Sequence, residues 1–407
     1  MPNNAYEQLA SELSDRGMNV RLLEQALGRF EIETPSWGYG NSGTRFGVFK
    51  EPGAARDIHE RLRDAAQVHK VTGATSSVAI HIPWDKVEDW DALKEEASEL
   101  KIEIGAVNPN VFQEKDYKYG SLTNFDENIR KKALDAILEC VEIMKAIDSD
   151  ILSLWFADGS NYPGQANMRK RKRWMQAALK EIHESLPDNS RMLVEYKLFE
   201  PGFYHTDIPD WGMAMLMCRH AGKNAQVLVD TGHHALGVNI EHIVGTLMDE
   251  QLLGGFHFNN RKYADDDLTV GSINPYEIFL IFVEILAGER EGLQPKTPIA
   301  YMIDQSHIVK NKIEAMIQSV MNAQTLYAKA LLVDAEALEE ARKTNNAVDA
   351  ERVLQQAYLT DVRPLIEKVR VDAGLMADPI LMHRESGYGD AVAKERVGEL
   401  KGAASWG

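Results

Sequence analysis

The sequence lacks several features that mark large classes of proteins. It contains only two cysteines, Cys140 and Cys218, which excludes a disulfide framework and a cysteine-rich zinc site. Both lie in apolar helical patterns, so we expect two core residues of a reduced protein. The chain does not start with a basic segment followed by an apolar one, and its longest apolar run, residues 278–287, is too short to span a bilayer. We therefore expect a cytoplasmic protein.

Positive charge is also scarce, with 45 Lys and Arg against 62 Asp and Glu and a formal net charge of −17. A surface of this charge repels phosphate backbones and anionic lipids. We expect no nucleic-acid partner and no membrane partner.

Short apolar segments alternate with amphipathic helical patterns along most of the chain. The helical patterns include residues 54–71, 126–147, 169–185, 240–250 and 275–287. The expected strands are residues 30–34, 77–82, 103–108, 151–156, 192–196, 225–230, 255–259 and 299–303. Eight apolar strands joined by helices predict an α/β protein, a (β/α)8 TIM barrel.

Two additions flank the predicted barrel. A helix over residues 6–27 precedes the first strand, and the chain after Asp304 is mostly helical through residues 308–341 and 350–371. Residues 378–407 look looser. We expect a barrel domain over residues 1–307, and over residues 308–407 a helical extension that packs on the barrel or on a neighbouring subunit.

Acidic and imidazole side chains end four successive strands, the fifth to the eighth. These residues are Glu195, Asp230, His257 and Asp304. Barrel closure brings them together at the face where barrel enzymes place their active sites. Three desolvated carboxylates repel one another, so the pattern indicates a cation, and this ligand set suits Mn²⁺, Mg²⁺ or Co²⁺. The alternative is a set of separate salt bridges around the barrel mouth.

A second set of metal-type ligands adjoins the first. His233 follows Asp230 by three residues, and an acidic triplet, residues 265–267, follows the seventh strand. Asp265 and Asp267 could face one ion while Asp266 points away. An acidic triplet alone is more often a solvated loop. Beside a strand that supplies His257, it supports a second ion that shares Asp230 with the first.

Lys197 lies two residues after Glu195 and shares its face of the strand. It could polarise a substrate oxygen, or it could be the counter-ion of Asp230 or Glu195.

Further strand-end residues have two interpretations each. His81 could be a core histidine, or a functional one that Asp85 orients. Trp37 and Trp155 could wall a sugar pocket and exclude water, or they could be ordinary core residues.

The segment over residues 38–43 matches G-x-G-x-x-G, but it follows Pro35-Ser-Trp and opens no clear helix. A dinucleotide site needs strand, tight turn and helix in that order, so we expect no nucleotide cofactor. The segment is better interpreted as a mobile loop over the barrel mouth that carries Phe46 toward a pocket.

Five motifs together resemble the L-rhamnose isomerases of the Pseudomonas and Bacillus type, which belong with xylose isomerase among the metal-dependent barrel isomerases. The motifs are Ile32-Glu-Thr-Pro-Ser-Trp-Gly, Trp155-Phe-Ala-Asp-Gly, Val194-Glu-Tyr-Lys, Val229-Asp-Thr-Gly-His-His and Met302-Ile-Asp-Gln-Ser-His. The resemblance implies an intramolecular oxidoreductase that interconverts L-rhamnose and L-rhamnulose, and related aldoses and ketoses. It also implies Mn²⁺ and a homotetramer.

The resemblance assigns roles to individual residues. It implies a structural ion with four ligands, Glu195, Asp230, His257 and Asp304. It implies a catalytic ion held by His233, Asp265 and Asp267, with Asp230 as the bridge. It places His81 at the sugar ring oxygen, Lys197 near the carbonyl, Trp37 and Trp155 in the pocket wall, and Phe46 in the pocket of an adjacent subunit.

Two chemical routes remain open for the transfer of hydrogen between C1 and C2 of the sugar. Hydroxide near Asp265 or Asp304 could remove the O2 proton while hydride shifts, or a carboxylate base could form an enediol. A metal-dependent sugar 3-epimerase on the same barrel is the nearest alternative function. A DNA-repair nuclease on this scaffold is disfavoured by the charge of −17, and a non-catalytic scaffold protein would not need seven metal-type ligands at strand ends.

Overall fold

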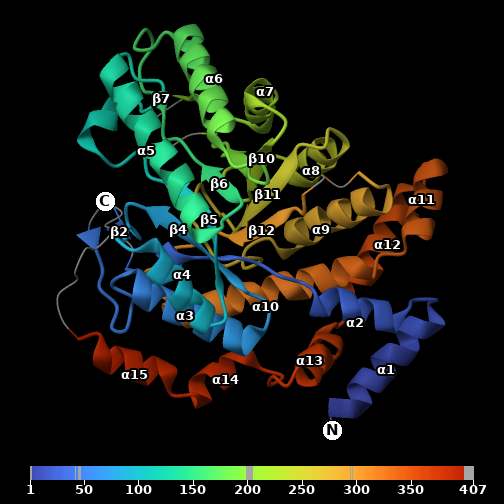
Figure 1. Ribbon diagram of the computed structural model, residues 1–407. Coiled ribbons are helices and arrows are strands. Elements are labelled where there is room, and N and C mark those ends of the chain that lie inside the picture. The colour runs from blue at the N-terminus through green and yellow to red at the C-terminus, as the bar shows by residue number, and fades with distance from the viewer. Residues whose placement is uncertain are drawn as a thin grey trace.

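The computed structural model describes residues 2–41, 43–44, 47–198, 205–293, 295 and 297–397. Within these residues, eight parallel strands form one sheet whose order follows the chain (Figure 1). They are β1 (Thr34–Pro35), β4 (Ser77–Ile82), β5 (Glu103–Pro109), β6 (Ile151–Leu154), β8 (Arg191–Glu195), β10 (Ala225–Asp230), β11 (Leu253–Phe258) and β12 (Ala300–Ile303). The backbone of Glu33 joins the last strand to the first, because its N–H donates to Tyr301 O at 2.8 Å and its C=O accepts from Ile303 N at 2.9 Å. The predicted barrel fold is confirmed.

A helix follows each of these strands, and each helix begins after an Asp or Asn. The helices are α3 (Ile58–Thr72), α4 (Trp90–Glu99), α5 (Glu127–Ile147), α6 (Met168–Ser185), α7 (Trp211–Ala221), α8 (Ile240–Asp249), α9 (Pro275–Arg290) and α10 (Lys312–Leu331). In all eight, the Asp or Asn side chain accepts a backbone N–H of the first turn. The sequence thus marks each helix start with a residue that satisfies otherwise unpaired N–H groups.

The core has two parts. A small cluster fills the barrel interior and consists of Trp37, Ala79, Ala106, Leu193, Leu228 and Met302. A larger one lies mainly between the sheet and the surrounding helices. Cys140 and Cys218 are buried and unpaired in the larger cluster, as predicted.

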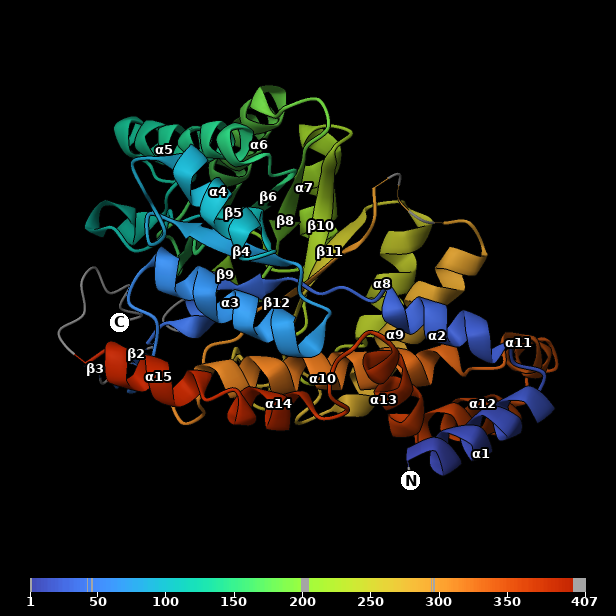
Figure 2. The same cartoon turned by 60° about the horizontal axis from the view of Figure 1, so that its bottom comes forward.

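The remaining helices cover one side of the barrel (Figure 2). They are α1 (Pro2–Asp15), α2 (Val20–Gly28), α11 (Ala335–Lys343), α12 (Ala347–Leu359), α13 (Arg363–Asp372), α14 (Pro379–Glu385) and α15 (Tyr388–Glu395). Helix α13 packs on α1 and α2, and α14 packs on α3 and α10. The division into units at residues 307 and 308 stays a prediction.

Three predicted elements differ from the structure. The helix expected over residues 6–27 is two helices, because Gly17 takes a φ of +79° and Asn19 caps the second one. The first strand is shorter and later than residues 30–34. Helices α14 and α15 occupy part of the segment expected to be looser, and residues 398–407 lie outside the described residues.

Short elements lie between the strands and helices of the barrel. Two further sheets have two strands each. In one, β2 (Gly43–Thr44) pairs with β3 (Gly47–Val48), and in the other, β7 (Gly159–Ser160) pairs with β9 (His205–Thr206). The 3₁₀ helices are η1 (Ser36–Tyr39) and η2 (Lys115–Tyr119). Among the helices described, none is long and apolar enough to cross a membrane.

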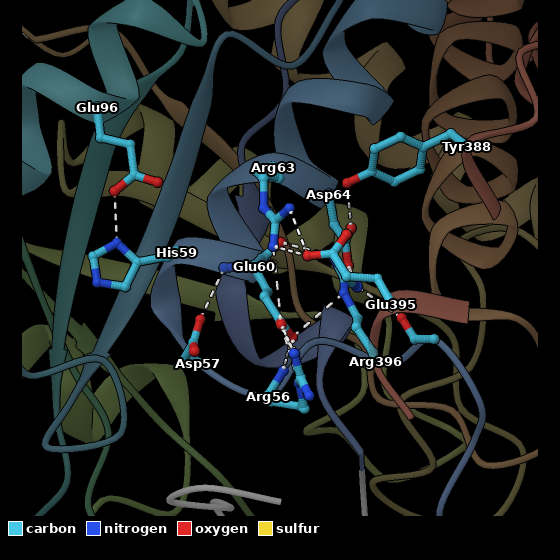
Figure 3. Close-up of polar contacts among 11 residues, drawn as sticks. Arg56, Asp57, His59, Glu60, Arg63, Asp64, Glu96, Tyr388, Glu395 and Arg396 are labelled. Carbon is cyan, nitrogen blue, oxygen red and sulfur yellow. Dashed lines mark hydrogen bonds and ion pairs between the residues drawn. The ribbon is translucent and has the colours of Figure 1, made fainter. Parts of the chain in front are cut away.

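A buried ionic network ties the end of α15 to the barrel helix α3 (Figure 3). Arg396 donates to both carboxylate oxygens of Asp64, at 2.7 and 2.8 Å, and to Gly53 O at 2.7 Å. The hydroxyl of Tyr388 donates to Asp64 at 2.8 Å. The Arg396 and Asp64 side chains are 0% and 1% exposed, so this pair is shielded from water.

We expect Arg396→Met to lower the free energy of unfolding by about 3–5 kcal/mol, because it leaves the buried Asp64 carboxylate without its cation. Urea denaturation measures this change. The control is Arg363→Met, whose side chain is 77% exposed at its ion pair with Asp361 and whose loss should leave the free energy of unfolding nearly unchanged. Equal effects of the two substitutions would contradict the assignment of the network.

Candidate metal centre

Four predicted ligands meet at the mouth of the barrel. Each of Glu195, Asp230, His257 and Asp304 offers one ligand atom, and these atoms lie within 4.8 Å of one another. His257 Nδ1 is 3.3 Å from Glu195 Oε2, 4.0 Å from Asp230 Oδ2 and 3.8 Å from Asp304 Oδ2. The carboxyl ends of β8, β10, β11 and β12 therefore create a site of oxygen and imidazole donors that could hold a divalent ion.

A second group adjoins the first and shares one residue with it. Asp230, His233 and Asp265 also offer ligand atoms within 4.8 Å of one another. His233 Nε2 lies 3.3 Å from Asp265 Oδ1 and 4.0 Å from Asp230 Oδ2. Asp230 is 0% exposed and belongs to both groups, which is the arrangement that a bridging carboxylate requires.

The three residues of the acidic triplet lie in different surroundings. Asp266 turns into its own loop, where it accepts the backbone N–H groups of Lys262 and, at 2.7 Å, Tyr263. Asp267 has a φ of +47° and does not enter either group of ligand atoms. Burial and the charges of Asp265 and Asp304 nevertheless raise its pKa well above the ordinary value, so it lies beside the centre. Its role as a ligand stays a prediction.

The pKa values show how closely these groups interact. Burial raises the pKa of Glu195, but His257 and His233 outweigh burial and bring it to about 2. Burial and the charges of Glu195 and Asp304 raise the pKa of Asp230 to about 7, although His233 opposes them. Burial lowers the pKa of His257, but Glu195 reverses the shift and brings it to about 9. Without a metal cation, protons on the imidazoles offset the carboxylate charge.

Backbone contacts hold His233 in one orientation. Its Nδ1 lies 3.0 Å from the carbonyl oxygen of Tyr196, which can only accept, so Nδ1 carries a proton and Nε2 faces Asp265. Arg261 anchors the same loop by donating to Thr231 O at 2.6 Å and to Glu277 at 3.1 Å.

Lys197 pairs with a carboxylate, but not with the ones the sequence suggests. Its Nζ lies 2.6 Å from Asp265 Oδ2, rather than on Glu195 or Asp230, and 5.0 Å from the ring centre of Trp155. Lys197 and His233 together lower the pKa of Asp265, against the effect of burial. The lysine is only 6% exposed and forms this ion pair at the wall of the centre.

His81 lies in an aromatic enclosure. Its ring stacks on Trp84 with centroids 4.0 Å apart and meets the edges of Trp37 and Phe112 at 5.5 and 5.8 Å. Asp85 does not bind the imidazole: its Oδ2 accepts the backbone N–H of His81 at 2.8 Å. Burial lowers the pKa of His81 to about 3, so the ring is neutral at ordinary pH.

Both predicted pocket walls lie beside other predicted site residues. Trp37 donates from Nε1 to Asp304 Oδ1 at 2.8 Å, which links the wall to a predicted ligand. Trp155 packs against Phe112 with centroids 4.7 Å apart. Trp84 and Phe112 also lie here and were not predicted, although each is an aromatic residue in the loop after a strand. Phe46 lies outside the described residues.

Comparisons with known proteins agree with this fold. The chain is 42% identical over 396 residues to a probable sugar isomerase of Rhizobium meliloti, covering 96% of this chain and 92% of that protein. A probable sugar isomerase of Mesorhizobium japonicum matches with the same identity and coverage.

A solved structure of L-ribulose 3-epimerase superposes with a TM-score of 0.55 at 12% identity, over 75% of this chain and 98% of that one. At that identity the match supports the fold alone. Residues 60–279 match the family described as xylose isomerase-like TIM barrel. The fold and the strand-end carboxylates and imidazoles agree with this match. Together with the relatives of 42% identity, it shows that the chain belongs to the xylose isomerase-like TIM barrel family.

Proposed function

We propose that this protein is an aldose–ketose isomerase that interconverts L-rhamnose and L-rhamnulose with two divalent metal ions. The observation that carries the proposal is the pair of ligand groups that share Asp230. The relatives of 42% identity named probable sugar isomerases support the isomerase class. The sequence motifs support L-rhamnose, Mn²⁺ (with Co²⁺ or Mg²⁺ as alternatives) and a homotetramer.

The geometry and the motifs both support these ligand sets, except that Asp267 is supported by the motifs alone. Glu195, His257 and Asp304 would hold the first ion, His233, Asp265 and Asp267 the second, and Asp230 both. The donors are oxygen and imidazole, which fit these metals. Bound divalent ions would supply Lewis acidity to the oxygens on C1 and C2 of the open sugar.

Side chains of the protein supply the remaining functions. A neutral His81 can accept a proton from a sugar hydroxyl and donate one to the ring oxygen, which opens the ring. The Lys197 ammonium, held by Asp265, stabilises negative charge on a sugar oxygen. Trp37, Trp84 and Trp155 enclose this space and reduce its contact with water.

We expect metal binding to release protons and to weaken as the pH falls. At pH 7 the imidazole of His257, with a pKa of about 9, carries a proton that must leave before its nitrogen can bind a metal. The pKa of His233 is also raised, and Asp230 has a pKa of about 7, so loading both sites at pH 7 should release at least two protons. As the pH rises toward 9 fewer protons are displaced, and the apparent affinity should rise.

Calorimetric titration of EDTA-treated protein with Mn²⁺, in buffers of different ionisation enthalpy, measures this release. Heats that do not depend on the buffer would contradict the proposed ligand roles of the two histidines.

Activity should be abolished by EDTA and restored by Mn²⁺, and L-rhamnose should give L-rhamnulose. NMR of the product distinguishes this reaction from the epimerase alternative, which would invert C3 of a ketose. The comparison of kcat/KM across L-rhamnose, L-mannose, L-lyxose and D-allose identifies the preferred aldose.

A matched pair of variants controls the activity assay. Asp304→Asn should lose turnover, whereas Glu139→Gln, at an exposed ion pair with Lys86, should retain it. If none of the four aldoses gives a ketose with Mn²⁺, Co²⁺ or Mg²⁺, the proposal is wrong.

A further inference from the structure

One oxygen of Asp230 lies between the two ligand groups. Its Oδ2 is 4.0 Å from His257 Nδ1 on one side and 4.0 Å from His233 Nε2 on the other. A small rotation of the carboxylate would move this oxygen away from one of the imidazoles. The contacts that fix the rotation therefore decide whether Asp230 can serve both groups.

Asn259 supplies the side-chain donor that fixes the carboxylate. It follows β11 directly and is 0% exposed. Its Nδ2 lies 3.0 Å from Asp230 Oδ1 and 3.2 Å from Oδ2, while the backbone N–H of Gly232 donates to Oδ1 at 2.6 Å. Asn259 thus contacts both oxygens of Asp230 and adds no negative charge to a centre that already holds several carboxylates.

The amide of Asn259 is itself held by the loop that carries His233. The Thr231 hydroxyl oxygen lies 3.2 Å from Asn259 Oδ1 and accepts the Asn259 backbone N–H at 2.9 Å. The oxygen end of the amide therefore faces Thr231, and the nitrogen end faces Asp230. A Cβ on Gly232 would lie 2.8 Å from Asn259 Oδ1, so position 232 has no room for a side chain without displacing the amide.

We propose that Asn259 is the positioning residue for the bridging carboxylate, and that it sets the affinity of both metal sites together. This inference rests on the proposed two-ion centre. Hydrogen-bond partners of metal ligands commonly change metal affinity by about 10- to 100-fold when removed. A partner of a shared ligand should change both affinities, whereas a partner or ligand of one site should change one.

The test is calorimetric titration of the full-length, EDTA-treated protein with Co²⁺. We expect Asn259→Ala to weaken both binding events about 10- to 100-fold. Asp304→Asn should weaken one event much more than the other. The Thr231→Val variant, which removes the hydroxyl beside Asn259 Oδ1 and leaves the contacts of Nδ2 with Asp230, should weaken both events by a smaller factor than Asn259→Ala.

The matched control is Asn108→Ala. Asn108 is another buried asparagine near a strand end, but its Nδ2 donates to the backbone oxygen of Ile80 at 3.1 Å. It should leave both affinities within about twofold of the wild type, because it contacts no ligand. Melting curves of the metal-free Asn259 and Asn108 variants check that both are folded.

The outcomes separate this inference from the proposed function. Fewer than two Co²⁺ ions per wild-type chain would overturn the two-ion centre itself. If the wild type binds two ions and Asn259→Ala binds both with unchanged affinity, or loses only one, the role of Asn259 is wrong while the centre stands. A parallel loss of both affinities in the Asn108 control would also overturn it.

Discussion

The structure depends on one electrostatic constraint: several carboxylates lie out of water at the same end of one barrel. Glu195 and Asp230 are almost fully buried, and Asp265 and Asp304 lie beside them. Such a group is stable only if positive charge offsets it, through protons, a lysine or metal ions. The imidazoles and Lys197 supply part of this charge. Divalent ions would supply it more completely, which is why we connect the acidity of the site with sugar isomerisation.

The loops around the centre follow from the same constraint, because each ligand needs a fixed position. Asp266 closes the loop after β11 with backbone hydrogen bonds, Arg261 anchors the loop after β10, and Asn259 holds the carboxylate between them. None of these three belongs to either group of ligand atoms. Their hydrogen bonds hold the ligands in place without help from solvent-exposed side chains. The ligands themselves come from four strands and two loops.

Much of the fold can be predicted from the sequence, since buried parallel strands are continuous apolar runs. Strands β4 and β10 have the predicted bounds, and barrel closure alone predicts that Glu195, Asp230, His257 and Asp304 meet. Strand β1 has two residues, too few for a clear pattern, so its bounds differ. The partner of Lys197 could not be predicted, because the loop after β11 folds back through long-range contacts that bring Asp265 to the lysine. The position of Asp267 could not be predicted either, because the backbone turns at this residue and Asp267 lies outside both groups of ligand atoms.

The central claim is that two ions share Asp230. The most direct measurement is an anomalous difference map from crystals equilibrated with Mn²⁺, recorded at the manganese absorption edge. We expect two peaks per chain, one beside Glu195, His257 and Asp304 and the other beside His233 and Asp265, both in contact with Asp230. A map without a peak at the barrel mouth, or with a single peak that does not touch Asp230, would contradict it.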